Sequence, residues 1–437
     1  MDYMNISKKL IDFIAQSPTP FHATQNLGEL LVRHGFTQLL ETRPWKLQKG
    51  EAYFFTRADS SIVAFIVGRL DASEHGIRLV GAHTDSPCLK VKPQPEKNIL
   101  GYFQLGIEVY GGVLLNPWFD RDLSLAGKVT YLDGDNNVCS TLIDFVRPIG
   151  VVPSLAIHLD REANDKRSVN AQADMNVILF QSSEKPSLRD LLLEKLHSDG
   201  LGDACAVLDF NLSFYDVQVP AIIGYQQDFI ASARLDNLLS SFVSINALTQ
   251  APRDYTSVVV CNDHEEIGSR SDIGAQGTML TDLLARLIPS EEQRQITLRR
   301  SLMLSVDNAH GVHPNFVAKH DDNHNPRLNL GPVLKFDANQ CYATSSDSAA
   351  FVRKLAKTPV ASEAADIPLQ TYVTRSDMRC GSTIGPITAS ELGVKTVDIG
   401  VPTFAMHSIR ELAGEKDVAS LNLLLARFYA SASVSLA

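Results

Sequence analysis

The chain has 437 residues, of which 44% are hydrophobic and 21% are charged, and its formal net charge is −10. This length suffices for two domains with buried cores, and the composition is that of a globular protein in water. The acidic excess argues against nucleic acid or an anionic membrane as the main partner, because proteins that bind these carry basic patches.

Two amphipathic helices are predicted within residues 6–36. They should separate at residues 17–20, because proline disfavours a helical conformation in the residue before it. The apolar stretch that opens this segment is interrupted by Asp12 and is too short for the core of a secretory signal. Two apolar runs follow, at residues 61–68 and 77–83, and they are typical of strands in a sheet that is covered on both faces.

The pattern changes over residues 92–231 to short alternating segments, which predict strands. These segments are residues 105–110, 127–132, 176–180 and 206–210. Only one helix is predicted among them, at residues 188–197. We therefore predict that this stretch is a β-rich insertion domain.

After Asp236, helices and strands alternate again. Strands are predicted at residues 257–261, 302–306, 368–373 and 395–399, and helices at residues 237–248, 281–287, 347–356 and 418–436. This alternation predicts an α/β fold with a mixed sheet. The simplest architecture is a catalytic α/β domain, residues 1–91 and 232–437, interrupted by the insert.

The six cysteines are scattered without a C-x-x-C spacing, so the sequence signals neither a zinc ribbon nor a disulfide framework. No apolar run reaches the length of a membrane-spanning helix. We therefore expect a soluble protein of the reducing cytoplasm.

Two adjacent carboxylates, Glu265 and Glu266, follow the apolar run at residues 258–261. Two acids just past a buried strand can divide the work of a hydrolase, one binding a metal ion and the other handling a proton. The alternative is a pair of surface charges. The chain contains such a pair at residues 291–292, where Ser290 predicts a helix cap and no chemistry is needed.

Other strand and helix ends carry residues of the same chemical kinds. Loops at the carboxyl ends of strands line the ligand crevice of α/β sheets, so side chains there converge although they are distant in sequence. Each residue alone has a structural alternative, since Asp236 or Asp307 could cap a helix or a turn. Together they match the ligands that zinc, manganese or cobalt prefer. The candidates are His83, Asp85, Asp236, Asp307 and His407.

A charge count suggests how two divalent ions would be held. If Asp236 bridges them, three carboxylates and a bridging hydroxide balance their charge. His83, together with Asp307 or Glu266, would complete the coordination of one ion. His407 would complete the coordination of the other ion.

Glu265 is then left over as a spare acid. Paired ions roughly 3.5–4 Å apart lower the pKa of the water that they share. The spare carboxylate can take the proton of that water and return it to the leaving amine. Asp85, two positions after His83, can orient its imidazole.

A rival metal site would use the histidines that follow Asp307. His310 and His313 have ligand-like spacing, but the glycine between them and the proline after them predict a loop. His320 and His324 lie in a polar turn. We expect at most one of these histidines to support a ligand.

Five motifs contain the candidate residues. They are GAHTDSP at residues 81–87, SARLDN at 232–237, DHEEIGS at 263–269, DNAHGVHP at 307–314 and GVPTFAMHS at 400–408. Together they resemble the motifs of the aspartyl aminopeptidase family of dinuclear metallopeptidases. The likeness runs nearly end to end and is in register at every motif.

The resemblance implies a ligand set for two divalent ions, which would be Zn²⁺, with Mn²⁺ or Co²⁺ as alternatives. The implied ligands are Glu266 and His407 for one ion, His83 and Asp307 for the other, and Asp236 between them. It also implies that Glu265 is the general base and that Asp85 orients His83.

The family removes acidic residues from peptide N-termini, which requires a cation near the substrate side chain. Lys335 matches the family position linked to that role, although alone it would be interpreted as a surface lysine. Tyr342 could polarise the carbonyl or stabilise the oxyanion.

The resemblance also implies a tetrahedral assembly of twelve subunits, in which the insert lends a histidine to a neighbour's site. His158 matches that residue, and the alternative is a strand histidine in the insert's own core.

The sequence therefore predicts a homo-oligomeric, metal-dependent aminopeptidase that removes N-terminal Asp and Glu from peptides. An aminopeptidase of broader specificity or a deacylase with the same two ions is the first alternative. The second is an inactive assembly protein that keeps metal for stability, but such a protein has no use for the spare Glu265. Neither nucleic acid nor a membrane is expected as a partner.

Overall fold

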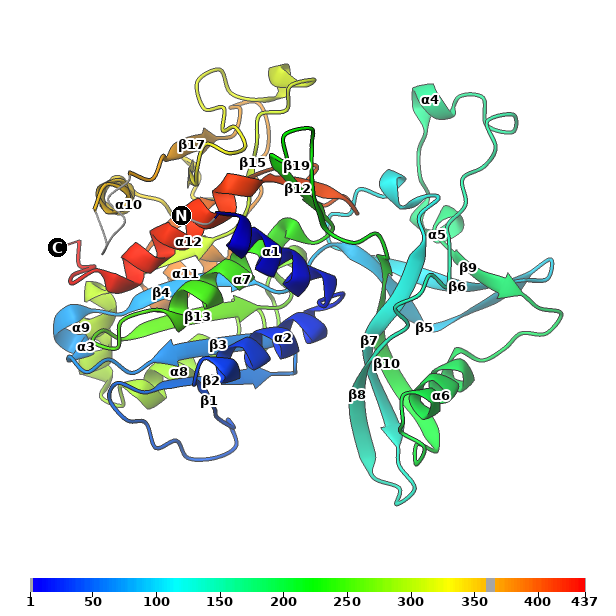
Figure 1. Cartoon of the computed structure of the whole chain (residues 1–437), viewed down its shortest axis with the longest axis horizontal. Coiled ribbons are helices and arrows are strands. Elements are labelled where there is room, and N and C mark those ends of the chain that lie inside the picture. The colour runs from blue at the N-terminus through cyan, green and yellow to red at the C-terminus, as the bar shows by residue number, and fades with distance from the viewer. Residues whose placement is uncertain (1–2, 359–365, 437) are drawn as a thin grey trace. The chain divides into compact units, whose positions relative to one another are not determined.

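The computed structural model describes residues 3–358 and 366–436. The chain divides into two compact units, and Figure 1 labels their helices and strands. The first unit comprises Met1–Ser86, Pro220–Met406 and Glu411–Ala437, and the second comprises Pro87–Val219 and His407–Arg410. The insertion domain at residues 92–231, with a role in oligomerisation, stays a prediction. Within the described residues, no helix has both the length and the apolar character needed to cross a membrane.

A nine-stranded mixed sheet is the centre of the first unit. Its order is β1 (Thr37–Gln38), β2 (Ala52–Arg57), β3 (Ser61–Ile66), β13 (Ser257–Asn262), β4 (Arg78–His83), β14 (Leu302–Val306), β18 (Lys395–Gly400), β16 (Val333–Phe336) and β17 (Gln370–Val373). In the middle, β4 pairs in parallel with β13 and β14, and β14 pairs in parallel with β18. The predicted α/β class with a mixed sheet is confirmed.

Helices cover both faces of this sheet. One core includes residues of α1 (Tyr3–Ala15), α2 (Pro20–Arg33), α7 (Leu235–Thr249), α10 (Ser346–Ala356) and α12 (Glu415–Ala430), and the other includes residues of α8 (Met279–Leu287) and α11 (Ile384–Leu392). Successive side chains of a strand point to opposite faces. Accordingly, Val80 of β4 packs in the first core and Leu79 in the second. Burial on both faces explains the continuous apolar runs of the sequence.

Most predicted elements of this unit are present, with differences that have local causes. The two N-terminal helices are confirmed, and Pro20 is the first residue of α2, where its missing N–H costs no hydrogen bond. The last helix ends at Ala430 because Ser431 adopts an extended conformation. Strand β17 begins at Gln370 rather than at residue 368. Position 368 is a proline, which cannot donate to the ladder.

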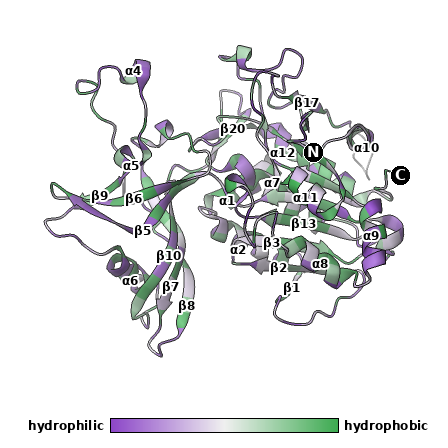
Figure 2. Ribbon diagram, turned by 180° about the vertical axis from the view of Figure 1, so that it is seen from behind, coloured by the Kyte–Doolittle hydropathy of each residue, from purple (hydrophilic) through white to green (hydrophobic). Residues whose placement is uncertain are grey.

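Helix α9 (Glu291–Arg300) is one that the sequence analysis marked only by its cap. The Ser290 side chain accepts the backbone N–H of Gln293, as predicted. Along the helix only Thr297 is buried. Figure 2 shows α9 largely in the colour of hydrophilic residues. Without an apolar stripe, the hydrophobic period of a helix is missing from its sequence.

A second, five-stranded sheet also belongs to the first unit. Its order is β11 (Ala221–Ile223), β12 (Phe229–Ser232), β20 (Glu411–Gly414), β19 (Pro402–Phe404) and β15 (Ala309–His310). Strands β12, β15 and β19 lie within or beside the motifs at residues 232–237, 307–314 and 400–408. The sheet therefore fixes the backbone on either side of those motifs.

The second unit contains a six-stranded antiparallel sheet. Its order is β8 (Val138–Asp144), β7 (Leu123–Leu132), β10 (Ala206–Asp216), β5 (Cys88–Ile99), β6 (Tyr102–Tyr110) and β9 (Val177–Gln181). Helix α6 (Leu188–Ser198) buries Leu188, Leu192 and Leu196 in the core of this unit. The four-residue spacing places these leucines on one helical face. Two further helices are short, α4 (Ala163–Lys166) and α5 (Ala171–Asp174).

Candidate metal centre

The carboxyl ends of adjacent strands bring the candidate residues of the first unit together. His83 is the last residue of β4, and Asp307 directly follows β14. Glu265 and Glu266 begin a short 3-10 helix, Glu265–Ile267, after β13. Because β13, β4 and β14 are parallel neighbours, their carboxyl ends meet at one edge of the sheet. Asp236 lies at the start of α7, where its backbone dihedral angles are not helical.

One imidazole nitrogen faces three carboxylates in this group. His83 Nε2 lies 3.5 Å from Asp236 Oδ1, 3.5 Å from Asp307 Oδ1 and 3.9 Å from Glu265 Oε2. The ligand atoms of His83, Asp236 and Asp307 all lie within 4.8 Å of one another, and so do those of His83, Glu265 and Glu266. The structure therefore brings five of the predicted residues into one cluster.

Asp85 connects His83 to the glutamate pair. Its Oδ1 lies 3.3 Å from His83 Nδ1, and its backbone carbonyl lies 3.0 Å from the same nitrogen. The two carboxylate oxygens accept the backbone N–H groups of Glu265 at 3.2 Å and Glu266 at 3.1 Å. A carboxylate on Nδ1 fixes the orientation of the ring and leaves Nε2 for a ligand role.

The electrostatics of the cluster show a surplus of negative charge. Burial raises the pKa of Glu265 well above its usual value, and the nearby Asp307, Glu266 and Asp85 raise it further. Burial alone would lower the pKa of His83, but Glu265, Asp236 and Asp307 outweigh it and raise that pKa. The cluster is therefore of the kind that a bound cation stabilises.

The donor set fits divalent ions. Imidazole nitrogen and carboxylate oxygen are the ligands of zinc sites that retain catalytic water. In addition, Asp307 Oδ1 is buried and accepts no hydrogen bond from the residues that the structure describes. These residues can therefore hold a metal ion, although the number of ions stays a prediction.

Three buried residues that the sequence analysis did not select position the cluster. Glu411 accepts the backbone N–H of Asp236 at 2.9 Å, and Ser86 donates its hydroxyl to the Asp236 carbonyl at 2.5 Å. Ser241 donates its hydroxyl to the His83 carbonyl at 2.7 Å. Ser86 lies in the motif at residues 81–87, whereas nothing in the sequence distinguishes Glu411 or Ser241.

Lys335 is buried beside the cluster, so its interpretation as a surface lysine is wrong. It lies in β16 and is 1% exposed. Its ammonium donates to Asp307 Oδ2 at 3.1 Å and to the Asn308 carbonyl at 3.0 Å, and it lies 4.9 Å from the centre of the Tyr342 ring. Burial alone would lower its pKa, but Asp307 and Asp398 raise it above the usual value, so the lysine stays charged. Burial also raises the pKa of the Tyr342 phenol, which stays protonated.

Two predicted residues lie in the second unit. His158 is in an exposed turn, so the alternative of a strand histidine in the core of the insert is wrong. His407 opens the segment His407–Arg410, and its ring Nδ1 lies 3.1 Å from the Gly112 carbonyl. The ligand role of His407 and the role of His158 at a neighbouring site stay predictions.

The rival histidines make local contacts instead. His320 Nε2 accepts the backbone N–H of His313 at 3.1 Å, and His324 Nδ1 lies 2.6 Å from Asp321 Oδ1. His310 lies in β15 and packs its ring against Tyr372. In the part of the chain that the structure describes, none of the four belongs to a group able to hold a metal ion.

Comparisons with known proteins match nearly the whole chain to one family. The family described as aminopeptidase I zinc metalloprotease, M18, matches residues 13–429. A probable M18 family aminopeptidase 2 of Stutzerimonas stutzeri is 56% identical over 431 residues, which cover 98% of this chain and 99% of the relative. The corresponding protein of Ectopseudomonas mendocina is 56% identical over 424 residues, which cover 97% of each.

Solved structures agree with the fold as well. A cryo-EM structure of the Ape4 and Nbr1 complex is similar with a TM-score of 0.92 and 37% identity, over 98% of this chain and 86% of that chain. The structure of the mApe1 dodecamer of S. cerevisiae is similar with a TM-score of 0.82 and 28% identity, over 98% of this chain and 97% of that chain. Sequence and fold therefore lead to the same group of proteins.

Proposed function

Because this chain belongs to the M18 family and is a zinc metallo-aminopeptidase, we propose that it removes N-terminal Asp and Glu from peptides. Water held between two divalent ions would be the nucleophile. The observation that carries this proposal is the cluster around His83, in which Glu265 is present in addition to enough ligands for a metal ion. A site that only stored metal would need no spare acid.

Five residues would hold the ions. They are His83, Asp236, Glu266, Asp307 and His407, as the family motifs imply. When bound, two divalent ions supply charge stabilisation at the scissile carbonyl and acidify the shared water. Asp85 would help to position these ligands, because it contacts His83 Nδ1 and accepts hydrogen bonds from the backbone N–H groups of both glutamates.

Glu265 would act as the general base. Its carboxylate accepts a proton from the attacking water and then donates it to the leaving amine. Glu265 lies 3.9 Å from His83 Nε2, beside the residues that would hold the ions. Tyr342 would donate a hydrogen bond to the substrate carbonyl or to the oxyanion.

Lys335 would provide the preference for acidic residues. Its ammonium is buried and paired with Asp307, so its positive charge lies at the proposed centre rather than in bulk solvent. Charge is little screened in such a place. A substrate carboxylate would therefore be favoured over an apolar side chain.

The second unit would join copies of this chain. Three large apolar residues close to His158 in the chain are exposed, Leu155 by 59%, Ile157 by 48% and Leu159 by 75%. Such a group is costly to leave in water and marks an interaction site. We assign a second copy of the chain as its partner, because a relative with the same fold is a dodecamer.

A panel of peptides that differ only in the N-terminal residue tests the proposal. The protein is assayed as purified, after metal removal by chelation, and after addition of Zn²⁺, Mn²⁺ or Co²⁺. We expect fastest release of Asp and Glu, loss of activity on chelation and recovery with metal. Equal rates for neutral residues would favour a broad aminopeptidase, and cleavage of N-acylated substrates alone would favour a deacylase.

A further inference from the structure

A second group of metal-binding side chains lies in the first unit, away from His83 in the chain. Asp337 and Cys341 belong to the turn after β16, and Cys380 lies in the loop between β17 and α11. Their three ligand atoms all lie within 4.8 Å of one another, and all three residues are half-buried. The pattern of cysteines in the sequence gives no sign of this group, because only the fold joins the two segments.

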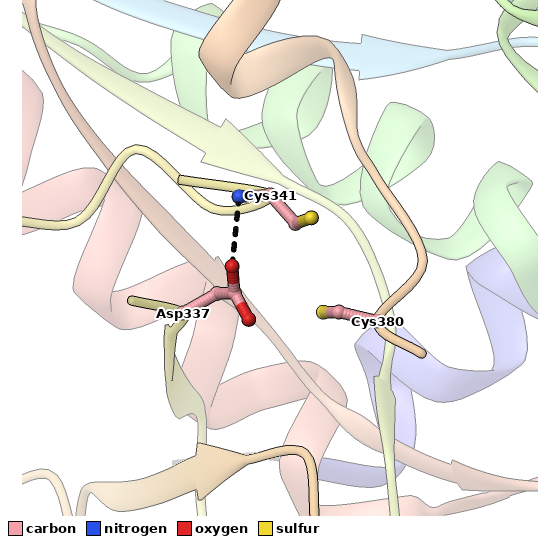
Figure 3. Close-up of side chains that lie close together, drawn as sticks. All are labelled: Asp337, Cys341 and Cys380. Carbon is pink, nitrogen blue, oxygen red and sulfur yellow. Dashed lines mark hydrogen bonds between the residues drawn. The ribbon is translucent and has the colours of Figure 1, made fainter. Parts of the chain in front are cut away.

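The backbone holds the Asp337 carboxylate in place. Its Oδ1 accepts the backbone N–H groups of Asn339 at 2.9 Å and Cys341 at 3.1 Å. Figure 3 shows the other carboxylate oxygen on the side of the two sulfur atoms, with the three groups facing a common space. The turn therefore presents an oriented oxygen ligand beside two thiols.

In the absence of a cation, the surroundings of Cys341 favour its neutral thiol. Burial raises the pKa of the Cys341 thiol, and Asp337 and Cys380 raise it further. Lys335, two residues before Asp337 in the chain, pairs with Asp307 instead. A divalent cation would reverse this preference, because it displaces the thiol proton and stabilises thiolate and carboxylate together.

The donors select the kind of cation. Two thiolates with one carboxylate suit zinc and softer ions of the same charge, and not magnesium or calcium. Two sulfurs at about 2.3 Å from one tetrahedral ion lie about 3.8 Å apart, so the present arrangement needs only a small closure. Three protein ligands leave a fourth position for water.

We propose that Asp337, Cys341 and Cys380 bind a divalent cation of the Zn²⁺ class, at a site distinct from the histidine and carboxylate cluster. Tyr342 follows Cys341 in the chain, and Cys380 packs against the small core that contains Tyr342 and Tyr372. A cation here would join the two loops that flank Tyr342. The site is therefore placed to set the position of that phenol.

Cobalt titration of the metal-free full-length protein, kept reduced with a phosphine, tests the proposal. Thiolate bound to Co²⁺ gives a sulfur-to-metal charge-transfer absorption, which imidazole and carboxylate ligands do not give. We expect this band to appear and, after the histidine and carboxylate cluster has also been filled, to reach a plateau whose intensity corresponds to one thiolate-bound ion per subunit. The band should weaken in Cys341→Ser and in Cys380→Ala and disappear when both are changed, and Asp337→Asn should raise the Kd for cobalt about tenfold or more.

Two matched variants serve as controls. Cys205→Ser removes an exposed thiol, and Cys139→Ser removes a thiol that also lies near an aspartate, Asp133. Both should keep the band. A band that is absent from the native protein, or that persists in Cys341→Ser with Cys380→Ala, overturns the proposal.

A thiol count in denaturant without reductant separates a metal site from a disulfide. The native protein should show all six thiols. Loss of two thiols, with residues 341 and 380 recovered in one cross-linked peptide, overturns the proposal in favour of a redox pair. Circular dichroism of each variant verifies that it is folded, so that a lost band reports lost ligands.

Discussion

At the scale of single residues, adjacent glutamates acquire different properties from their surroundings. Glu265 lies 3.9 Å from His83 Nε2, and burial raises its pKa. The second acidic pair of the chain, residues 291–292, lies exposed in the first turn of α9. There a carboxylate serves only to oppose the positive end of the helix dipole. The same dipeptide thus has a structural role at the start of a helix and a proposed chemical role after the end of a strand.

Glu265→Gln should lower turnover by about 10²–10⁴-fold, because the proton acceptor is lost while the ligands remain. Metal content per subunit, measured by elemental analysis, should be unchanged. Glu292→Gln is the matched control and should leave turnover unaltered. Substantial residual turnover in Glu265→Gln would refute the general-base role.

Lys335→Met should lower kcat/KM for acidic N-termini about 10–100-fold, since a hydrogen bond to a charged group contributes roughly 1.5–3 kcal/mol. Peptides with neutral N-termini should lose less. Lys335 also donates to Asp307, so metal content must be measured in parallel. The same fractional loss on every substrate would show that Lys335 acts only by positioning Asp307.

Asp417 links stability to pH. It is buried in α12, where burial raises its pKa to about 7 although it accepts the backbone N–H groups of Asn329 and Gly331. Its pKa in the unfolded chain is about 3.9, so the folded state favours the protonated acid. This contribution to stability is complete below about pH 3.9 and is lost as the pH rises through about 7.

Asp417→Asn should therefore gain stability relative to the native protein as the pH rises from about 4 to about 8, by a few kcal/mol at most. Urea unfolding at several pH values measures this difference. Asp135→Asn, in an exposed turn, should show no such trend. A difference that stays constant with pH would contradict a raised pKa at Asp417.

At the scale of elements, the parallel strands determine which residues meet. The register pairs Asn262 of β13 with His83 of β4, so the ends of the two strands coincide. Beside them, the Asp307 N–H donates to the carbonyl of Ile399 in β18. Gly400 completes this contact, because a Cβ at that position would lie 1.8 Å from the Asp307 carbonyl oxygen.

Gly400→Ala should displace Asp307 and lower both metal affinity and turnover, with a stability loss of about 1–3 kcal/mol for overpacking. Calorimetry and metal analysis measure the two effects. Gly202→Ala is the control, since a Cβ there meets nothing within 4 Å. Native activity in Gly400→Ala would show that the contact does not position Asp307.

The sequence could predict the elements whose apolar patterns match their place in the fold. The buried runs of β4, β13 and β14 were recognisable, and with them the strand ends that carry His83 and Asp307. Strand β16 was missed because it has only four residues and a lysine within it. The buried pairing of that lysine with Asp307 joins distant segments, and no local pattern encodes it.

At the scale of the whole molecule, the two units divide the proposed tasks. The first contains the cluster around His83, whereas the second exposes the apolar turn around His158. The resemblance to the family marked His158, but the sequence could not show that the neighbouring apolar residues are exposed. Alternating strands predict a sheet, and whether a loop residue is covered depends on the tertiary fold.

Leu159→Asp should reduce the assembly to smaller species, because a charge buried at an interface without a partner costs several kcal/mol. Light scattering after size-exclusion chromatography measures the mass. Val146→Asp, which changes an exposed valine elsewhere in the second unit, should leave the mass unchanged. An unaltered mass for Leu159→Asp would exclude this turn from subunit contacts.

The position of β4 has a consequence for synthesis of the chain. The strand is made early, but both of its partners, β13 and β14, follow the segment Pro87–Val219 of the second unit in the sequence. On the ribosome, an apolar strand therefore waits without neighbours while the second unit emerges and folds around its own core. Closure of the nine-stranded sheet must be a late and slow event, since its central contacts span long stretches of chain. Until then, the apolar residues of β4 lack the strands that pair with it in the folded sheet.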